Sequence, residues 1–259
     1  MLAEVRAEVS YRLIRFGFEN PVFGSKVALK VEEGATLDSA RVADHRERDF
    51  AKSARLYYSV LNTSGDIDEK IWAFGGLVLQ LINAHAFRQA RELLRDQSPM
   101  LRAELPEDKR YFLEADAKGK EGRIESVERG YKPAIECFLT VEEILKKRGS
   151  ERWTLEDKKA FSTAEHFLGK LKLELAVMGV NKEDNLQVSR GHLLRAIKMD
   201  TEIRGAGVEE TVGYGFKELA RNYLAAGNIK EADKALEEAI KHFEAYTKTT
   251  PRSNVLIEL

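Results

Sequence analysis

Residues 213–250 read GYGFKELARNYLAAGNIKEADKALEEAIKHFEAYTKTT, and this stretch decides the fold. It predicts two helices joined by a tight turn. Gly227 stands where the first helix must end in a left-handed conformation, which glycine adopts without steric cost. Small residues at Ala220 and Ala232 allow the two helices to approach closely, and we expect Ile229 to fill the turn. The apolar residues Phe216, Leu219 and Tyr223 recur at helical spacing and form one stripe on the first helix.

The same stretch resembles a tetratricopeptide (TPR) repeat, a helix–turn–helix unit of about 34 residues. The matching residues are Phe216, Leu219, Ala220, Tyr223, Gly227, Ile229, Ala232, Leu236 and Ala239. The resemblance implies that such units stack into an α-solenoid, in which each unit buries its apolar face against its neighbours. It also implies a concave groove, lined by the first helix of each unit, that binds a segment of a partner.

Weaker copies of the pattern precede this unit. They are predicted over residues 71–102, 107–148 and 155–202. In the first of them Val78 replaces the usual small residue, so its two helices should lie further apart. Asp66 or Asp68 is a plausible N-cap for that pair. In the third, Gly179 should end one helix and Asp184 could cap the next. We therefore expect a mostly α protein with a TPR-like helical repeat domain over residues 36–259.

The first 35 residues have a different pattern. Two β-favouring runs, Tyr11–Phe18 and Lys26–Val31, flank a segment rich in turn-forming residues. This pattern favours a short N-terminal β-hairpin element over residues 1–35, and the alternative is a helix from Leu2 to Phe16. The apolar side chains of such a hairpin must cover the first helices or contact a second copy of the chain, so a homo-oligomer is possible.

One long helix is predicted over Thr36–Leu61, capped by Thr36 or Asp38. The charged run DHRERD, residues 44–49, should lie on its polar face. The segment NTSGD, residues 62–66, should end it.

The composition favours an intracellular, cytoplasmic protein. Of 259 residues, 33% are charged, and the net charge is −1, so no broad nucleic-acid or membrane surface is indicated. The longest apolar run, Leu77–Ile82, is far too short to span a bilayer. Cys137 is the single cysteine, which excludes an intramolecular disulfide.

No catalytic constellation is recognisable, so we expect no enzyme, no metal and no cofactor. None of the histidines belongs to an H-E-x-x-H pattern; they are His45, His85, His166, His192 and His242. Cys137 has apolar neighbours in a predicted helix, which favours a buried small hydrophobe over a nucleophile.

The remaining functional surface is the expected groove. Carried over from the family by position, its binding residues are Trp72, Asn83, Tyr214, Lys217 and Arg221. Lys217 and Arg221 are four residues apart and share a helix face, so they could pair with an acidic or C-terminal carboxylate. Leu79 and Leu173 occupy positions where the family's carboxylate clamp often has Asn, which argues against binding of chaperone tails. The sequence thus predicts non-catalytic protein–protein interaction; the alternative is a nucleic-acid-associated protein that uses the N-terminal hairpin.

Overall fold

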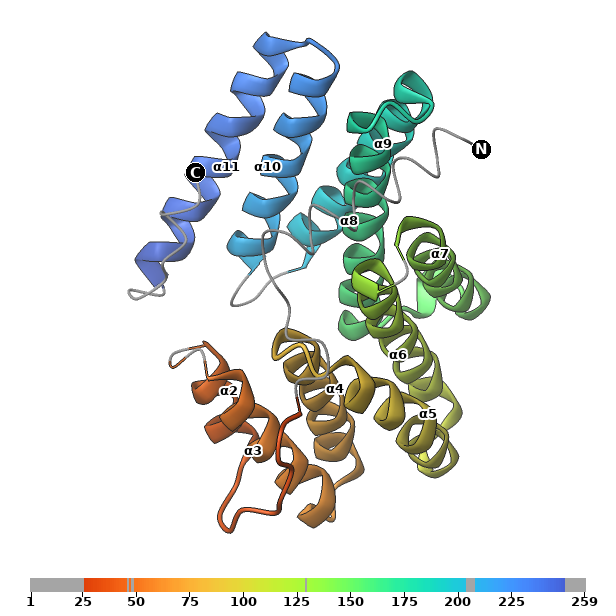
Figure 1. The fold of residues 1–259 in the computed structure, drawn as a ribbon, viewed down its shortest axis with the longest axis vertical. Coiled ribbons are helices and arrows are strands. Elements are labelled where there is room, and N and C mark those ends of the chain that lie inside the picture. The colour runs from red at the N-terminus through yellow and green to blue at the C-terminus, as the bar shows by residue number, and fades with distance from the viewer. Residues whose placement is uncertain (1–25, 46, 48, 129, 204–207, 250–259) are drawn as a thin grey trace. The chain divides into compact units, whose positions relative to one another are not determined.

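The computed structural model describes residues 26–249 except 46, 48, 129 and 204–207, and every regular secondary-structure element in that part is a helix (Figure 1). The helices are α2 (Leu37–His45), α3 (Phe50–Thr63), α4 (Ile67–Asn83), α5 (Phe87–Glu104), α6 (Glu107–Glu128), α7 (Tyr131–Arg148), the short 3-10 helix η1 (Ser150–Arg152), α8 (Leu155–Val177), α9 (Lys182–Glu202), α10 (Val208–Ala225) and α11 (Ile229–Thr249). No strand occurs within those residues. The predicted mostly α fold is confirmed.

The chain divides within α7 into two compact units. The N-terminal unit takes its described residues from 26–137, and the C-terminal unit takes its described residues from 138–249. Each unit is built from antiparallel helices with a buried apolar interior. The predicted boundary between residues 35 and 36 stays a prediction.

The predicted long helix over residues 36–61 is wrong, because the chain breaks between α2 and α3. Asp49 ends the break as the N-cap of α3, where its side chain accepts a hydrogen bond from the Lys52 N–H at 2.8 Å. The buried Ser53 hydroxyl donates to the Ala40 carbonyl at 2.9 Å. Ala40, Ala43 and Ala54 are completely buried, so α2 folds back onto α3 at close range. The broken arrangement buries these apolar residues, whereas one continuous helix would leave them exposed to water. The break is therefore the more stable arrangement.

The pair α4–α5 agrees with the predicted helix pair. Asp66 caps α4 as expected, accepting a hydrogen bond from the Asp68 N–H at 2.8 Å. Phe74, Leu77, Val78 and Leu81 are fully buried on α4. The main neighbour of α4 is nevertheless α3 rather than α5. Gly76 explains this, because a Cβ there would lie 2.5 Å from the Tyr57 ring of α3.

The N-terminal hairpin is not shown. Its first run, Tyr11–Phe18, lies outside the described residues, and its second run, Lys26–Val31, is extended but forms no strand. The side-chain amide of Gln89 on α5 pairs with this segment instead: it accepts from the Val27 N–H at 2.7 Å and donates to the Val27 carbonyl at 2.9 Å. Val27 is buried in the same core as Tyr57 of α3, so this run packs on the helices without forming a hairpin.

The pair α8–α9 forms the first hairpin of the C-terminal unit. Thr154 and Asp157 make a reciprocal capping box at the start of α8. Gly179 follows the helix with a φ of +82°, as predicted. The predicted Asp184 cap is wrong: α9 begins earlier, with Asn181 as the N-cap residue. Asn185 donates to the Val180 carbonyl at 2.7 Å, so this side chain closes the loop and the helix starts ahead of Asp184.

The pair α10–α11 closely matches the sequence prediction. Gly227 has a φ of +78°, and Ala220 and Ala232 are completely buried. The expectation for Ile229 is wrong, since its side chain is 65% exposed at the first position of α11. Backbone hydrogen bonds close the turn instead, the principal one running from the Asn228 N–H to the Tyr223 carbonyl at 2.9 Å.

Candidate functional site

Two of the predicted groove residues lie in the N-terminal unit, on α4. Trp72 is partly exposed, and its ring centroid lies 6.1 Å from that of Phe112 on α6. Asn83 is half-buried at the end of α4 and donates from Nδ2 to the Gln80 side chain at 3.3 Å. Both side chains are at least partly accessible to solvent, and a residue of a binding surface must be accessible.

The other three predicted residues lie on one side of α10. The Lys217 ammonium is 5.9 Å from the centroid of the Tyr214 ring. That ring packs edge-to-face on Phe243 of α11 at 5.2 Å. One turn further along, Arg221 donates to Glu218 at 2.7 Å and to Glu174 of α8 at 2.9 Å. The structure therefore places Tyr214, Lys217 and Arg221 along one side of α10, with Tyr214 against α11 and Arg221 reaching α8.

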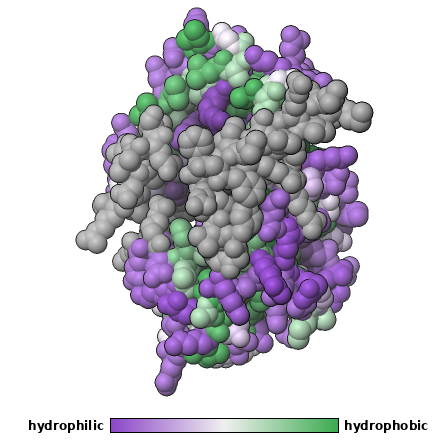
Figure 2. Space-filling view, viewed as in Figure 1, coloured by the Kyte–Doolittle hydropathy of each residue, from purple (hydrophilic) through white to green (hydrophobic). Residues whose placement is uncertain are grey.

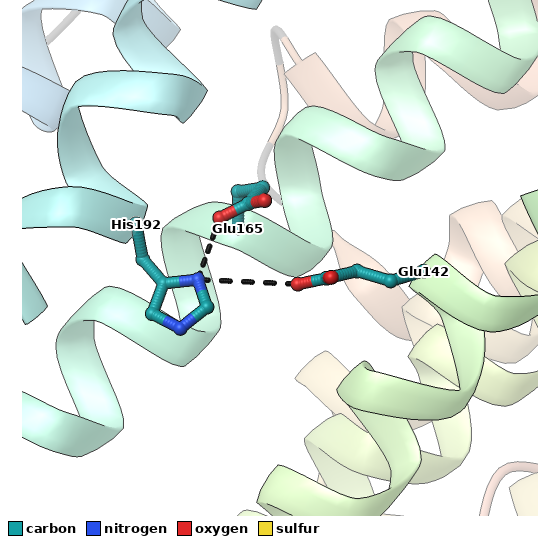
Figure 3. Close-up of side chains that lie close together, drawn as sticks. All are labelled: Glu142, Glu165 and His192. Carbon is teal, nitrogen blue, oxygen red and sulfur yellow. Dashed lines mark hydrogen bonds and ion pairs between the residues drawn. The ribbon is translucent and has the colours of Figure 1, made fainter. Parts of the chain in front are cut away.

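The structure also brings together a second group of candidate side chains, which the sequence pattern did not indicate. Glu142 on α7, Glu165 on α8 and His192 on α9 point toward one another inside the C-terminal unit (Figure 3). One potential ligand atom from each lies within 4.8 Å of the others. The side chains are 9%, 1% and 11% exposed, respectively. Three successive helices thus contribute a carboxylate, a carboxylate and an imidazole to one buried point.

His192 Nδ1 is the centre of this group. It lies 2.6 Å from Glu165 Oε2 and 3.9 Å from Glu142 Oε1, as the dashed lines in Figure 3 mark. The guanidinium of Arg195, one turn along α9, places Nη2 2.7 Å from the same nitrogen. Two carboxylates and one cation therefore approach a single ring nitrogen.

Two basic side chains hold the outer oxygens of the carboxylates. Arg195 donates from Nε to Glu165 Oε1 at 2.8 Å, and Lys146 donates to Glu142 Oε2 at 2.6 Å. Burial alone would raise the pKa of Glu165, but its hydrogen bonds to His192 and Arg195 outweigh burial and lower that pKa. The hydrogen bond to Glu165 in turn raises the pKa of Arg195. Glu165 is therefore a carboxylate at neutral pH.

The inner oxygen of Glu142 is less well satisfied. Oε1 is buried and has no hydrogen-bond partner among the described residues. A buried carboxylate oxygen without a partner is costly, because it has lost its hydration without replacement. The sequence held one signal of this site: Glu142 and Glu165 directly follow the apolar residues Val141 and Ala164.

Cys137 is not part of this group. It is buried, and burial raises the pKa of its thiol to about 11. The nucleophilic form is the thiolate, which such a pKa makes rare near neutral pH. The prediction of a buried small hydrophobe at this position is thus supported.

Comparison with known proteins gives a likeness at the level of the fold. The crystal structure of BtubC (BKLC) from P. vanneervenii is similar with a TM-score of 0.53 and 16% sequence identity, covering 93% of this chain and 88% of that chain. No family model matches the sequence, and no curated protein matches it. Among the described helices, none combines the length and the apolar character needed to cross a membrane.

Proposed function

We propose that this chain is a non-catalytic, TPR-like protein that binds a segment of a partner protein against α8 and α10. One observation carries the proposal. Arg221 reaches from α10 to Glu174 on α8, so this residue of the row lies beside the neighbouring first helix, as a groove residue in a helical repeat would.

The chemistry of this row suits an acidic segment or a terminal carboxylate. Arg221 is partly exposed, with 43% of its side chain accessible, whereas its partners Glu218 and Glu174 are more buried, at 11% and 24%. The guanidinium group has five N–H donors, so a carboxylate from a partner could accept a charge-assisted hydrogen bond from it beside these two glutamates. Lys217 adds a second cation, and the Tyr214 ring adds apolar contact area beside it.

Polar recognition also agrees with the surface. Where Figure 2 is coloured, hydrophilic side chains alternate with smaller groups of hydrophobic ones. Where charged side chains dominate a surface, complementary charge sets the partner and the rate of association more than apolar area does.

Affinity capture with the full chain tests this proposal. The bait would be incubated with nuclease-treated cell extract, beside a Lys217→Ala/Arg221→Ala variant. A matched control changes two exposed lysines of α11 that also sit in local ion pairs, Lys234→Ala/Lys241→Ala. We expect the first variant to lose the captured protein and the second to retain it, with unchanged circular dichroism for both.

If both variants captured the partner equally well, Lys217 and Arg221 of α10 would not be part of the binding surface. If a partner were captured from untreated extract but not from nuclease-treated extract, the result would favour the nucleic-acid alternative instead.

A further inference from the structure

We propose that Glu142, Glu165 and His192 bind a divalent transition-metal ion, with Zn²⁺ as the best fit, and that the ion ties α7, α8 and α9 together. This site is separate from partner binding on α10. The three residues come from three helices of one compact unit, and their potential ligand atoms converge within 4.8 Å (Figure 3).

The protonation of His192 gives the first argument. If Nδ1 carries a proton, it donates to Glu165 Oε2 at 2.6 Å but then opposes the Arg195 N–H at 2.7 Å. If Nδ1 carries a lone pair, it accepts from Arg195 but faces the lone pairs of Glu165. Either state leaves one of the two short contacts unfavourable. A metal ion relieves this conflict, because imidazole and carboxylate both donate lone pairs to it.

The second, independent argument is the inner oxygen of Glu142. It is buried, lacks a hydrogen-bond partner among the described residues, and points toward His192 at 3.9 Å. A buried anion of this kind is normally paired with a cation or bound to a metal. Lys146 already occupies the other oxygen of Glu142, so the inner oxygen remains available as a ligand.

The surrounding side chains form the support that metal ligands usually have. Lys146 holds the outer oxygen of Glu142, and Arg195 Nε holds the outer oxygen of Glu165. Each inner oxygen is thereby directed at His192. Such outer contacts orient ligands and strongly affect metal affinity.

The geometry requires only small side-chain adjustments. Two ligands of one tetrahedral Zn²⁺ lie about 3.4 Å apart, because each is about 2.1 Å from the ion. The observed separations from Nδ1, 2.6 Å to Glu165 and 3.9 Å to Glu142, bracket that value. Arg195 Nη2 must leave Nδ1; the Arg195 side chain is 51% exposed, so its guanidinium group has room to rotate while Nε keeps its hydrogen bond to Glu165.

The donor set selects the class of ion. One imidazole and two carboxylates suit Zn²⁺ and its neighbours Co²⁺ and Mn²⁺, whereas Mg²⁺ and Ca²⁺ prefer oxygen ligands alone. Three protein ligands would leave one Zn²⁺ position for water. Because the site is buried and links three helices, we assign the ion a stabilising role.

The primary test is metal binding by the full chain after removal of any tag and of metal by chelator. Calorimetric titration with Zn²⁺ should show saturable binding of one ion, and the thermal midpoint should rise with Zn²⁺ because the ion binds only the folded state. Mg²⁺ should leave the midpoint unchanged. Co²⁺ should bind the same site and give the intense visible absorption of tetrahedral coordination.

Variants locate the ion. His192→Asn and Glu142→Gln should each weaken Zn²⁺ binding on the order of 100-fold, at or above the usual cost of losing even a supporting contact. His242→Gln is the matched control, because His242 Nδ1 also lies 2.6 Å from a carboxylate, Glu209, but belongs to no group of three potential ligands within the described part of the chain. That variant should bind Zn²⁺ normally.

Glu142→Gln keeps the size of the side chain, so it separates loss of a ligand from loss of the fold. Two results would overturn the proposal: absence of saturable Zn²⁺ binding to the unaltered chain, or binding that persists at full strength in folded Glu142→Gln and His192→Asn proteins. The second result would assign the ion to adventitious surface groups.

Discussion

The hairpins α4–α5 and α10–α11 carry similar apolar patterns but pack differently. In α10, Gly213 lies against Phe243 of α11, where an added Cβ would approach the ring to 2.6 Å. In α4, Gly76 lies against Tyr57 of the preceding helix α3, and Val78 stands where α10 has Ala220. Accordingly α10 packs mainly on the helix that follows it, and α4 packs mainly on the helix that precedes it.

The difference shows what selects the partner of a helix in a stack. An apolar stripe determines that a face is buried, but the smallest residues determine which neighbour can approach its backbone most closely. Moving a glycine or alanine around the helix therefore redirects its closest contact without changing the hydrophobic pattern.

The largest expected effect comes from removing the ring that fills the close contact in α10–α11. Phe243→Ala should lower the free energy of unfolding by about 3–5 kcal/mol, the usual cost of deleting a buried aromatic side chain. Phe243 is almost completely buried. Urea denaturation measures the change, and Ile229→Ala, at an exposed position of the same helix, should change stability by about 0.5 kcal/mol or less. A loss below about 1 kcal/mol for Phe243→Ala would show that the hairpin does not depend on this contact.

A smaller effect should follow from overfilling the same interface. Ala232→Leu should cost about 1–3 kcal/mol, because a completely buried alanine leaves no room for three further carbons. The equivalent change in the other hairpin, Ala90→Leu, should cost less if Val78 holds α4 and α5 further apart. Denaturant midpoints of the two variants compare the interfaces directly, and equal losses would argue against a wider α4–α5 contact.

The smallest effect is expected at the contact between α4 and α3. Gly76→Ala adds a methyl group that must displace the Tyr57 ring, while alanine itself favours the helix by about 1 kcal/mol. We expect a net loss of about 1 kcal/mol by chemical denaturation. Gly75→Ala is the control, since its methyl group would meet only the side-chain ends of Asp116 and Lys120. If Gly76→Ala stabilised the protein as much as Gly75→Ala, Gly76 would not set the α3–α4 approach.

The sequence predicted most accurately those features, such as helix ends, that depend on only a few neighbouring residues. Asp66 and Gly227 end or begin helices through bonds to nearby backbone, so their roles follow from local chemistry. The break before Asp49 could not be predicted in this way. Residues 44–49 contain neither Gly nor Pro, and the break is stabilised by Ala40 packing against α3, a tertiary contact.

The buried charged group illustrates the same limit for function. Glu165 and His192 each occupy a position on a buried helix face, which is a visible local anomaly. Their meeting with Glu142 depends on how α7, α8 and α9 are packed, and the spacing along the chain contains no sign of it. The row on α10 was predicted because its members recur within a single helix.

The pairing of Gln89 with Val27 has a consequence for the order of folding. These hydrogen bonds join residues separated by 62 positions, whereas the helical hairpins join neighbours in sequence. Closing so long a loop costs chain entropy before any bond forms, and contacts of high sequence separation slow folding. The extended segment that precedes α2 should therefore dock late, on helices that have already assembled. The Gln89 amide then pairs with the backbone of Val27, as a neighbouring β-strand would do in a sheet.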